Sequence, residues 1–194
     1  MKSSSEFGNI VLLNGAPRSG KSSICREVQR TLDGIWLNFG VDQMAAMIPD
    51  SVKPGIGLRP GGECPRLEPV VFSLYLSMYE SIAAFSRRGF HVLVDVGHHE
   101  WYAEPMEIFS HCLSLLEGLP VYTVGVFCPL DEILHRREVT GYPARDQNGM
   151  VLPAVLRWQE AVHKGKTYDL TLDTSLLSPT ECAEKIGEML FQKK

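Results

Sequence analysis

A glycine-rich segment near the start of the chain constrains the fold more than any other feature of the sequence. It reads LNGAPRSGKSS over residues 13–23 and directly follows the apolar run Ile10–Leu13. Residues 15–22 fit the pattern G-x-x-x-x-G-K-[ST], in which backbone N–H groups at a helix N-terminus cradle the phosphates of a nucleotide. An apolar strand, this loop and a helix in direct succession therefore predict an α/β fold that binds a nucleotide.

The residues of this phosphate loop have separate expected roles. Lys21 is expected to reach the β- and γ-phosphates, and the Ser22 hydroxyl is expected to ligate Mg2+. The glycines let the backbone approach anionic oxygens that side chains would keep away. The alternative is a glycine-rich turn in which the lysine is incidental. The predicted nucleotide-binding residues are Gly15, Ala16, Pro17, Arg18, Ser19, Gly20, Lys21, Ser22 and Ser23.

Strand-like and helical segments alternate along the rest of the chain. Strands are expected at 9–14, 35–40, 90–97, 121–128 and within 168–175. Helices are expected at 21–32, 41–48, 67–88, 104–117, 130–139 and 154–165, and from Pro179. This alternation indicates a five-stranded parallel sheet with helices on both faces, in a three-layer α/β fold. No linker interrupts it, so we expect residues 1–194 to form one domain. Residues 50–65, rich in proline and glycine, predict a functional or mobile loop.

Composition bears mainly on partners and compartment. The formal net charge is −4 and the pI is near 5.9, which argues against a nucleic-acid binder, because such proteins usually present a basic face. No apolar stretch approaches the roughly 20 residues that cross a bilayer, and the N-terminus lacks the apolar region of a secretory signal. The five cysteines include no C-x-x-C pair, which favours reduced thiols. We expect a cytoplasmic protein without membrane or nucleic-acid partners, whose oligomeric state is open.

Two aspartates end strand-like segments and are expected at the carboxyl edge of the sheet, where ligands bind in such folds. Asp95 follows the run His91–Val94 and is suited to hold Mg2+ directly or through water, with a helix cap or turn as the alternative. Asp42 follows the second predicted strand and is suited to accept the proton of an acceptor hydroxyl. An N-cap for the helix at 43–48 explains its position equally well.

The segment TGYPARDQNG, residues 140–149, is expected to be a mobile lid. Arginines on such a segment can close over a triphosphate and stabilise charge during phosphoryl transfer. The alternative is a solvated helix end, whose basic residues interact with the helix dipole. The arginines concerned are Arg136, Arg137 and Arg145.

Several of these segments together resemble the chloramphenicol 3-O-phosphotransferase family of P-loop kinases. The matching segments are LLNGAPRSGKSS, WLNFGVD, VGVFCPLDEIL and LRWQEAVHKGKTYDLTLDTSLLSPTECA. They lie within residues 9–49 and 87–190. The resemblance implies a P-loop kinase-like fold and ATP- and Mg2+-dependent phosphorylation of a hydroxyl on a small molecule. It also implies that Asp42 is the catalytic base and that Asp173 and Thr174 lie near the adenine. The catalytic residues expected on both grounds are Asp42, Lys21, Arg137 and Arg145.

The chain departs from this family in two places. The family has paired aspartates after its third strand, where this chain has Asp95-Val96-Gly97-His98-His99. The two histidines are expected either to line an acceptor pocket or to be polar surface. The family also has a compact arginine-rich lid, for which TGYPARDQNG stands here. Because residues 50–80 match weakly, the resemblance leaves the acceptor open, whether an antibiotic or a metabolite.

Three other functions are compatible with parts of the sequence. A toxin-like kinase acting on nucleotide sugars would share the phosphate loop and a base after the second strand. A nucleotide-hydrolysing switch or binding module would share the loop, although the chain contains no N-K-x-D motif for guanine. A sulfotransferase loop can contain PRSG, but Lys21 followed by Ser22 favours a nucleoside triphosphate.

Overall fold

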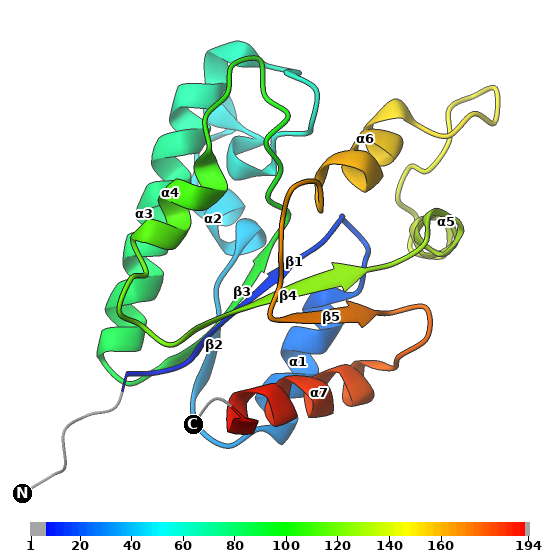
Figure 1. Ribbon diagram of the computed structural model, residues 1–194. Coiled ribbons are helices and arrows are strands. Elements are labelled where there is room, and N and C mark those ends of the chain that lie inside the picture. Colours follow the sequence, from blue (N-terminus) through cyan, green and yellow to red (C-terminus); the bar gives the residue numbers. More distant parts are fainter. Residues whose placement is uncertain (1–6, 193–194) are drawn as a thin grey trace, which may run out of the picture.

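The five predicted strands all form, and they pair in parallel in one sheet (Figure 1). The structure is a computed structural model, and it describes residues 7–192. The order across the sheet is β2-β3-β1-β4-β5, so the first strand lies at the centre. The strands are β1 (Ile10–Asn14), β2 (Trp36–Asn38), β3 (His91–Val96), β4 (Val121–Phe127) and β5 (Leu170–Asp173).

Helices cover both faces of this sheet, which confirms the expected three-layer architecture (Figure 1). On one face α3 and α4 pack over alternate strand residues such as Ile10 and Leu12. On the other face α1 and α7 pack over Val11 and Leu13. The helices are α1 (Lys21–Thr31), α2 (Val41–Met47), α3 (Glu68–Arg87), α4 (Ile108–Ser114), α5 (Leu130–Val139), α6 (Pro153–Ala161) and α7 (Pro179–Gln192).

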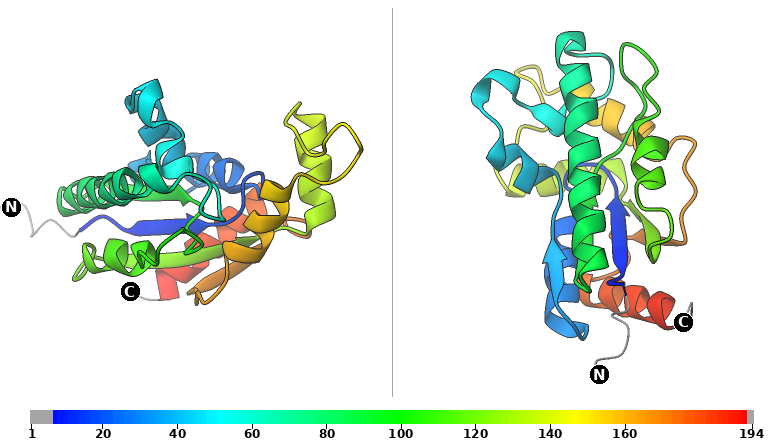
Figure 2. Two further views of the ribbon diagram at one scale, coloured as in Figure 1. Left: turned by 90° about the horizontal axis from the view of Figure 1, so that it is seen from above. Right: turned by 90° about the vertical axis from the view of Figure 1, so that its left-hand side faces the viewer.

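The position of β1 explains why the phosphate loop lies at a binding edge. All five residues of β1 are buried, as expected for a central strand covered on both faces. Its last residue, Asn14, lies opposite Val96 of β3 and Gly125 of β4. The loop that follows therefore emerges between the carboxyl ends of two neighbouring strands, where ligands bind in open α/β sheets. Figure 2 shows α5, the loop 140–149 and α6 gathered at one end of the sheet.

Most predicted elements end within one or two residues of their expected bounds, but two helices and one strand are shorter by three residues or more. The helix expected at 104–117 begins at Ile108, because Glu107 has the left-handed φ of 46° and cannot continue a helix. The helix expected at 154–165 ends at Ala161. The strand expected at 35–40 is limited to β2, which pairs with β3 alone at the sheet edge.

The segment 50–65 is more ordered than its composition predicts. It contains two short 3-10 turns, η1 (Asp50–Val52) and η2 (Gly55–Gly57), and it leads into a third, η3 (Pro65–Leu67). Ile56 and Leu58 are each only 2% exposed and belong to the core under α3. The segment is therefore a packed wall of the molecule rather than a free surface loop.

Candidate functional site

The phosphate loop has a backbone that only small residues allow. A Cβ atom added to Gly15 would lie 2.5 Å from the carbonyl oxygen of Val126 and 2.7 Å from Ser19 Oγ, so no side chain fits there. Gly20, the N-cap of α1, has the left-handed φ of 98°, which glycine adopts without strain. The loop thus runs close to β4 and turns directly into α1, whose N-terminal N–H groups form an anion-binding end.

Lys21 is held over the loop by backbone carbonyls. Its side chain is buried, and Nζ donates hydrogen bonds to the carbonyl oxygens of Gly15 at 2.9 Å and Ala16 at 3.0 Å. The same Nζ lies 3.6 Å from Asp95 Oδ1. An ammonium group in this position provides a fixed point charge at the place where the sequence predicts phosphate oxygens.

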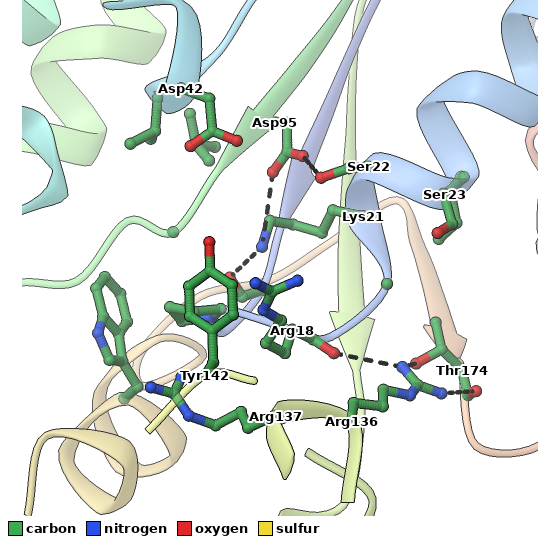
Figure 3. A pocket seen from close by; sticks show the side chains of 18 of the residues that line it. Arg18, Lys21, Ser22, Ser23, Asp42, Asp95, Arg136, Arg137, Tyr142 and Thr174 are labelled. Atoms are coloured by element: carbon green, nitrogen blue, oxygen red, sulfur yellow. Dashed lines mark hydrogen bonds and ion pairs between the residues drawn. The ribbon is translucent and has the colours of Figure 1, made fainter. Parts of the chain in front are cut away.

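Ser22 and Asp95 come together beside Lys21 (Figure 3). The Ser22 hydroxyl donates a hydrogen bond of 2.7 Å to Asp95 Oδ2. A hydroxyl and a carboxylate are the hard oxygen donors that Mg2+ prefers, with phosphates and waters completing its shell. Residues 7–192 contain no cluster of three or more His, Cys, Asp or Glu side chains suited to a metal. The donor set therefore fits a cation shared with a phosphate. Asp95 belongs to β3, so it is neither a helix cap nor a turn residue.

Asp42 lies across from the loop at the start of α2. The N-cap of this helix is Gly40, whose N–H donates a hydrogen bond of 2.9 Å to Gln43 Oε1. Asp42 is therefore not the N-cap, which corrects that alternative. Its carboxylate is exposed and forms no hydrogen bond or ion pair with any described residue. Figure 3 shows Asp42 and Asp95 on the same side of the pocket, with Arg137 and Tyr142 on the opposite side.

Gly40 explains how Asp42 comes to lie near Asp95. A Cβ atom at Gly40 would lie 2.2 Å from the carbonyl oxygen of Asp95. The turn between β2 and α2 is thus pressed against the end of β3, and side chains larger than hydrogen are excluded. This close contact fixes the first turn of α2, and with it Asp42, relative to the Ser22–Asp95 pair.

A second set of contacts closes the other end of the loop. Arg136 donates to Thr174 through Nη1 to Oγ1 at 3.1 Å and through Nη2 to the carbonyl at 2.7 Å. Thr174 in turn donates from Oγ1 to the carbonyl oxygen of Ser19 at 2.7 Å. Arg136 therefore clamps the turn after β5 to the phosphate loop, a role that the sequence does not reveal. Asp173 instead accepts hydrogen bonds from the backbone and hydroxyl of Ser175 and does not line the cleft.

The other two arginines predicted to act with the lid, Arg137 and Arg145, lie apart in the structure. Arg137 lines the cleft, with Nε donating to the carbonyl of Pro143 at 2.8 Å. Arg145 does not line it, because Nε pairs with Glu138 Oε1 at 3.3 Å and Nη1 bonds the carbonyl of Gly149. The lid does contact the loop elsewhere: the Arg18 guanidinium lies 3.5 Å from the centre of the Tyr142 ring. Tyr142 is a contact that the sequence analysis missed.

The cleft bounded by these elements has a volume of about 920 Å3. Of the predicted loop residues, Ala16 and Ser19 are buried beneath its surface, and the other members line it. Arg59 and Trp158 also line the cleft, although nothing in their local sequence marks them. The cleft is therefore formed by the phosphate loop, α2, the segment 50–65, the lid and α6 together.

His98 and His99 are neither polar surface nor part of the cleft, which corrects both expectations for them. His98 is fully buried, and its Nε2 lies 2.8 Å from the hydroxyl of Tyr79. His99 donates from Nε2 to the carbonyl of Leu58 at 3.0 Å. Burial lowers the pKa of His98 well below its ordinary value and that of His99 to about 4. Both rings are therefore neutral core residues at pH 7.

The fold and the site together define a P-loop nucleotide-binding protein of the kinase type. The chain matches the family of chloramphenicol phosphotransferase-like proteins over residues 8–191, and it belongs to this family. Two Mycobacterium tuberculosis relatives bearing the name "Putative O-phosphotransferase" are 27% identical to it, over 93% of this chain and 81% of theirs. Membership of this family identifies the chain as phosphotransferase-like, in agreement with the prediction from the sequence.

Several solved structures share the fold, and two of those described next are kinases. The Mycobacterium tuberculosis APS kinase, in complex with AMPPNP and APS, has a TM-score of 0.66 at 19% identity, covering 95% of this chain and 98% of that one. Shikimate kinase from Acinetobacter baumannii, in complex with shikimate, has a TM-score of 0.63 at 13% identity, with 98% and 96% covered. The Deinococcus radiodurans tunicamycin resistance protein has a TM-score of 0.60 at 20% identity, with 94% and 95% covered. Within residues 7–192, every helix is too short or too polar to cross a membrane.

Proposed function

We propose that the protein transfers the γ-phosphate of ATP to a hydroxyl group of a small molecule in a reaction that requires Mg2+. The observation that carries this proposal is the free carboxylate of Asp42, fixed by Gly40 beside a Ser22–Asp95 pair and a buried lysine. In phosphoryl transfer the acceptor oxygen must approach the γ-phosphorus in line with the bond that breaks. One side of the cleft would bind the phosphate donor, and the other would bind the hydroxyl acceptor.

The donor side is the phosphate loop with its neighbours. Backbone N–H groups of the loop and Lys21 would bind the β- and γ-phosphates, and Ser22 and Asp95 would hold the metal. Bound Mg2+ neutralises charge on the phosphate oxygens and fixes their orientation. Thr174 lines the cleft beside this site, so we place the nucleotide base on that side, near Asp173 and Thr174.

The acceptor side is centred on Asp42. Its carboxylate would orient the acceptor hydroxyl and take its proton as the oxygen attacks the γ-phosphorus. A new P–O bond to the acceptor forms while the bond to the β-phosphate oxygen breaks, and ADP leaves. Because Asp42 forms no hydrogen bond or ion pair with any residue in the described range 7–192, its two oxygens are available for this contact.

The loop 140–149 would act as a lid that closes over the bound nucleotide. Arg137 already faces the cleft and would stabilise charge on the transferred phosphoryl group. Arg145 would reach the cleft only if its pairing with Glu138 opened on closure. We further propose that residues 1–194 act as one cytoplasmic domain, in keeping with the five free cysteines. We propose a small-molecule acceptor as its partner, rather than a nucleic acid or a membrane, for either a monomer or a homo-oligomer.

The test is ATP consumption by the purified chain with Mg2+, against a panel of hydroxylated antibiotics, sugars and metabolites. We expect at least one acceptor to stimulate ADP formation and to yield a phosphorylated product detectable by mass spectrometry. EDTA and the variant Ser22→Ala should each suppress this reaction. ADP formation that no acceptor stimulates, with inorganic phosphate as the sole product, would instead identify a nucleotide-hydrolysing module.

A further inference from the structure

The cleft carries a charge opposite to that of the chain. The chain has a formal net charge of −4, yet six cationic side chains and two carboxylates line the cleft. The carboxylates are Asp42 and Asp95. The cations are Arg18, Lys21, Arg26, Arg59, Arg136 and Arg137. Positive charge is therefore concentrated in the cleft and exceeds what two carboxylates can balance.

Arg59 differs from the other cations in where it comes from. Lys21, Arg18 and Arg26 belong to the phosphate loop and α1, and Arg136 and Arg137 belong to α5. Arg59 comes from the segment 50–65, on the acceptor side of the cleft. Its ion pair with Glu63 is 3.5 Å long, and both side chains are exposed. Exposed pairs of this kind contribute little, so a ligand anion can compete for the guanidinium.

The backbone on both sides of Arg59 is anchored. Leu58 is 2% exposed, and its carbonyl accepts the hydrogen bond from His99 Nε2 at 3.0 Å. Gly61 donates from its N–H to the carbonyl of Trp101 at 2.8 Å. The Tyr75 hydroxyl donates to the carbonyl of Ile56 at 3.2 Å. Arg59 therefore projects from a stretch of backbone that is anchored on both sides.

Arg137 lies close enough to Arg18 and to Arg59 for their positive charges to act on its guanidinium. The pKa of Arg137 is lowered by burial first and then by the charges of Arg18 and Arg59. Neither Asp42 nor Asp95 forms an ion pair with Arg59 or Arg137. An anion bound between Arg59 and Arg137 would relieve this repulsion.

An aromatic side chain, Trp158, lines the same cleft as these arginines. A Cβ atom on Gly97 would lie 3.1 Å from Cζ3 of Trp158, so the indole packs directly on the glycine backbone at the end of β3. Trp158 also lies edge-to-face with His99, with ring centres 5.1 Å apart. Together with Ile56, this ring gives the cleft an apolar surface of fixed orientation, which suits the carbon skeleton of a small molecule.

We propose that the acceptor is a small hydroxylated anion whose carboxylate or phosphate group is bound by Arg59. Its carbon skeleton lies on Trp158, and its hydroxyl lies at Asp42. The anionic group must point away from Asp42 and Asp95, because like charges at short range repel. This inference rests on the proposed phosphotransfer and adds to it the class of the acceptor.

The first experiment compares acceptors with the same carbon skeleton that differ in the presence of one anionic group. Glucose is paired with glucose 6-phosphate, adenosine with AMP, and the methyl ester of 4-hydroxymandelate with the free acid. We expect kcat/KM for the anionic member of at least one pair to exceed that of its neutral partner by about tenfold or more. The phosphate and carboxylate pairs distinguish the two possible anionic groups. A protein that uses the neutral member of every productive pair equally well overturns the inference while leaving phosphotransfer intact.

The second experiment needs no turnover and so separates the two proposals. The full chain is loaded with AMPPNP and Mg2+ to fill the donor side, and binding of inorganic sulfate is measured by calorimetry. We expect sulfate to bind, and Arg59→Gln to weaken binding by about tenfold. Arg66→Gln is the matched control, because Arg66 is exposed in η3 and does not line the cleft. Absence of sulfate binding, or equal binding by Arg59→Gln and wild type, contradicts the role of Arg59.

Discussion

The two sides of the cleft differ in how many of their polar groups already have protein partners. On the donor side, Lys21, Ser22 and Asp95 bond to one another or to loop carbonyls. On the acceptor side, and among the residues that the structure describes, Asp42 forms no hydrogen bond or ion pair, and Arg59 pairs with the exposed Glu63. Polar groups that already bond to one another are preorganised for one particular ligand. Polar groups without a protein partner form their hydrogen bonds or ion pairs only when a ligand binds. The difference places recognition of the nucleotide on one side and choice of acceptor on the other.

Removing the charge of Lys21 should have the largest effect, because it disables the donor side. We expect Lys21→Ala to lower turnover by about 10³-fold or more, since a fixed cation at the transferred phosphate is lost. The fold should persist, because the Nζ bonds of Lys21 go to carbonyls of the loop itself. Lys185→Ala, an exposed position on α7, makes the same charge change and should leave kcat unaltered. Wild-type ATP affinity and turnover in Lys21→Ala would remove the loop from the mechanism.

Gly40→Ala should break the link between the two sides. The new methyl group would overlap the Asp95 carbonyl, so the turn before α2 must move and carry Asp42 with it. We expect a loss of about 2–3 kcal/mol in the free energy of unfolding, together with a lower kcat. Gly57→Ala is the control, since its nearest neighbour would be Pro54 Cβ at an ordinary 3.7 Å. If the two variants unfold at the same urea concentration, the close contact at Gly40 is not restrictive.

Low pH should destabilise the folded protein through His99, whose hydrogen bond to the carbonyl of Leu58 anchors the segment 50–65. Burial lowers the pKa of His99 from 6.5 to about 4, so below pH 6.5 the unfolded chain binds a proton that the folded chain does not. Stability from this residue is fully present above pH 6.5 and is lost as the pH falls towards 4. We expect a loss of about 2–3 kcal/mol over this range.

The measurement is urea unfolding at several pH values, compared with His99→Gln. Glutamine can still donate a hydrogen bond to Leu58 but does not titrate, so its stability should fall less steeply with acid. Parallel pH dependences for the two proteins would show that His99 does not titrate on unfolding.

Tyr142→Ala should have the smallest effect, because it removes one contact between lid and loop. The stacking of Arg18 on an exposed aromatic ring is worth about 0.5–1 kcal/mol, which corresponds to a change of a few-fold in lid closure. We expect faster backbone hydrogen exchange across residues 140–149 and a few-fold higher KM for ATP. Tyr142→Phe keeps the ring and should behave as wild type; a phenylalanine variant as impaired as the alanine variant would exclude stacking.

The parts of the site that could be predicted are those whose conformation depends on residues close together in the sequence. The phosphate loop is a continuous segment whose conformation is set by its own glycines, so its residues and their positions were predicted from the pattern alone. The edge positions of Asp42 and Asp95 follow from parallel strands that end together. Their roles at that edge stay predictions.

The features that the sequence did not reveal depend on contacts between distant segments. Arg136 bonds Thr174, which is 38 residues away, and His99 bonds Leu58 across 41 residues. No local pattern distinguishes a buried histidine pair from a polar turn. Arg59 and Trp158 reach the cleft because the segment 50–65 and α6 pack beside the sheet, which composition and periodicity do not specify.

The most direct test of the account is to measure nucleotide binding and phosphoryl transfer separately in Asp42→Asn. Asparagine is nearly isosteric and fits the first turn of α2, but it cannot accept the hydroxyl proton. If the donor side works independently of Asp42, calorimetric affinity for AMPPNP with Mg2+ should equal that of wild type. On the best acceptor from the panel, kcat should fall by about 10²–10⁴-fold. Near-normal transfer by Asp42→Asn, or a parallel loss of nucleotide binding, would contradict the division of the cleft into a donor side and an acceptor side.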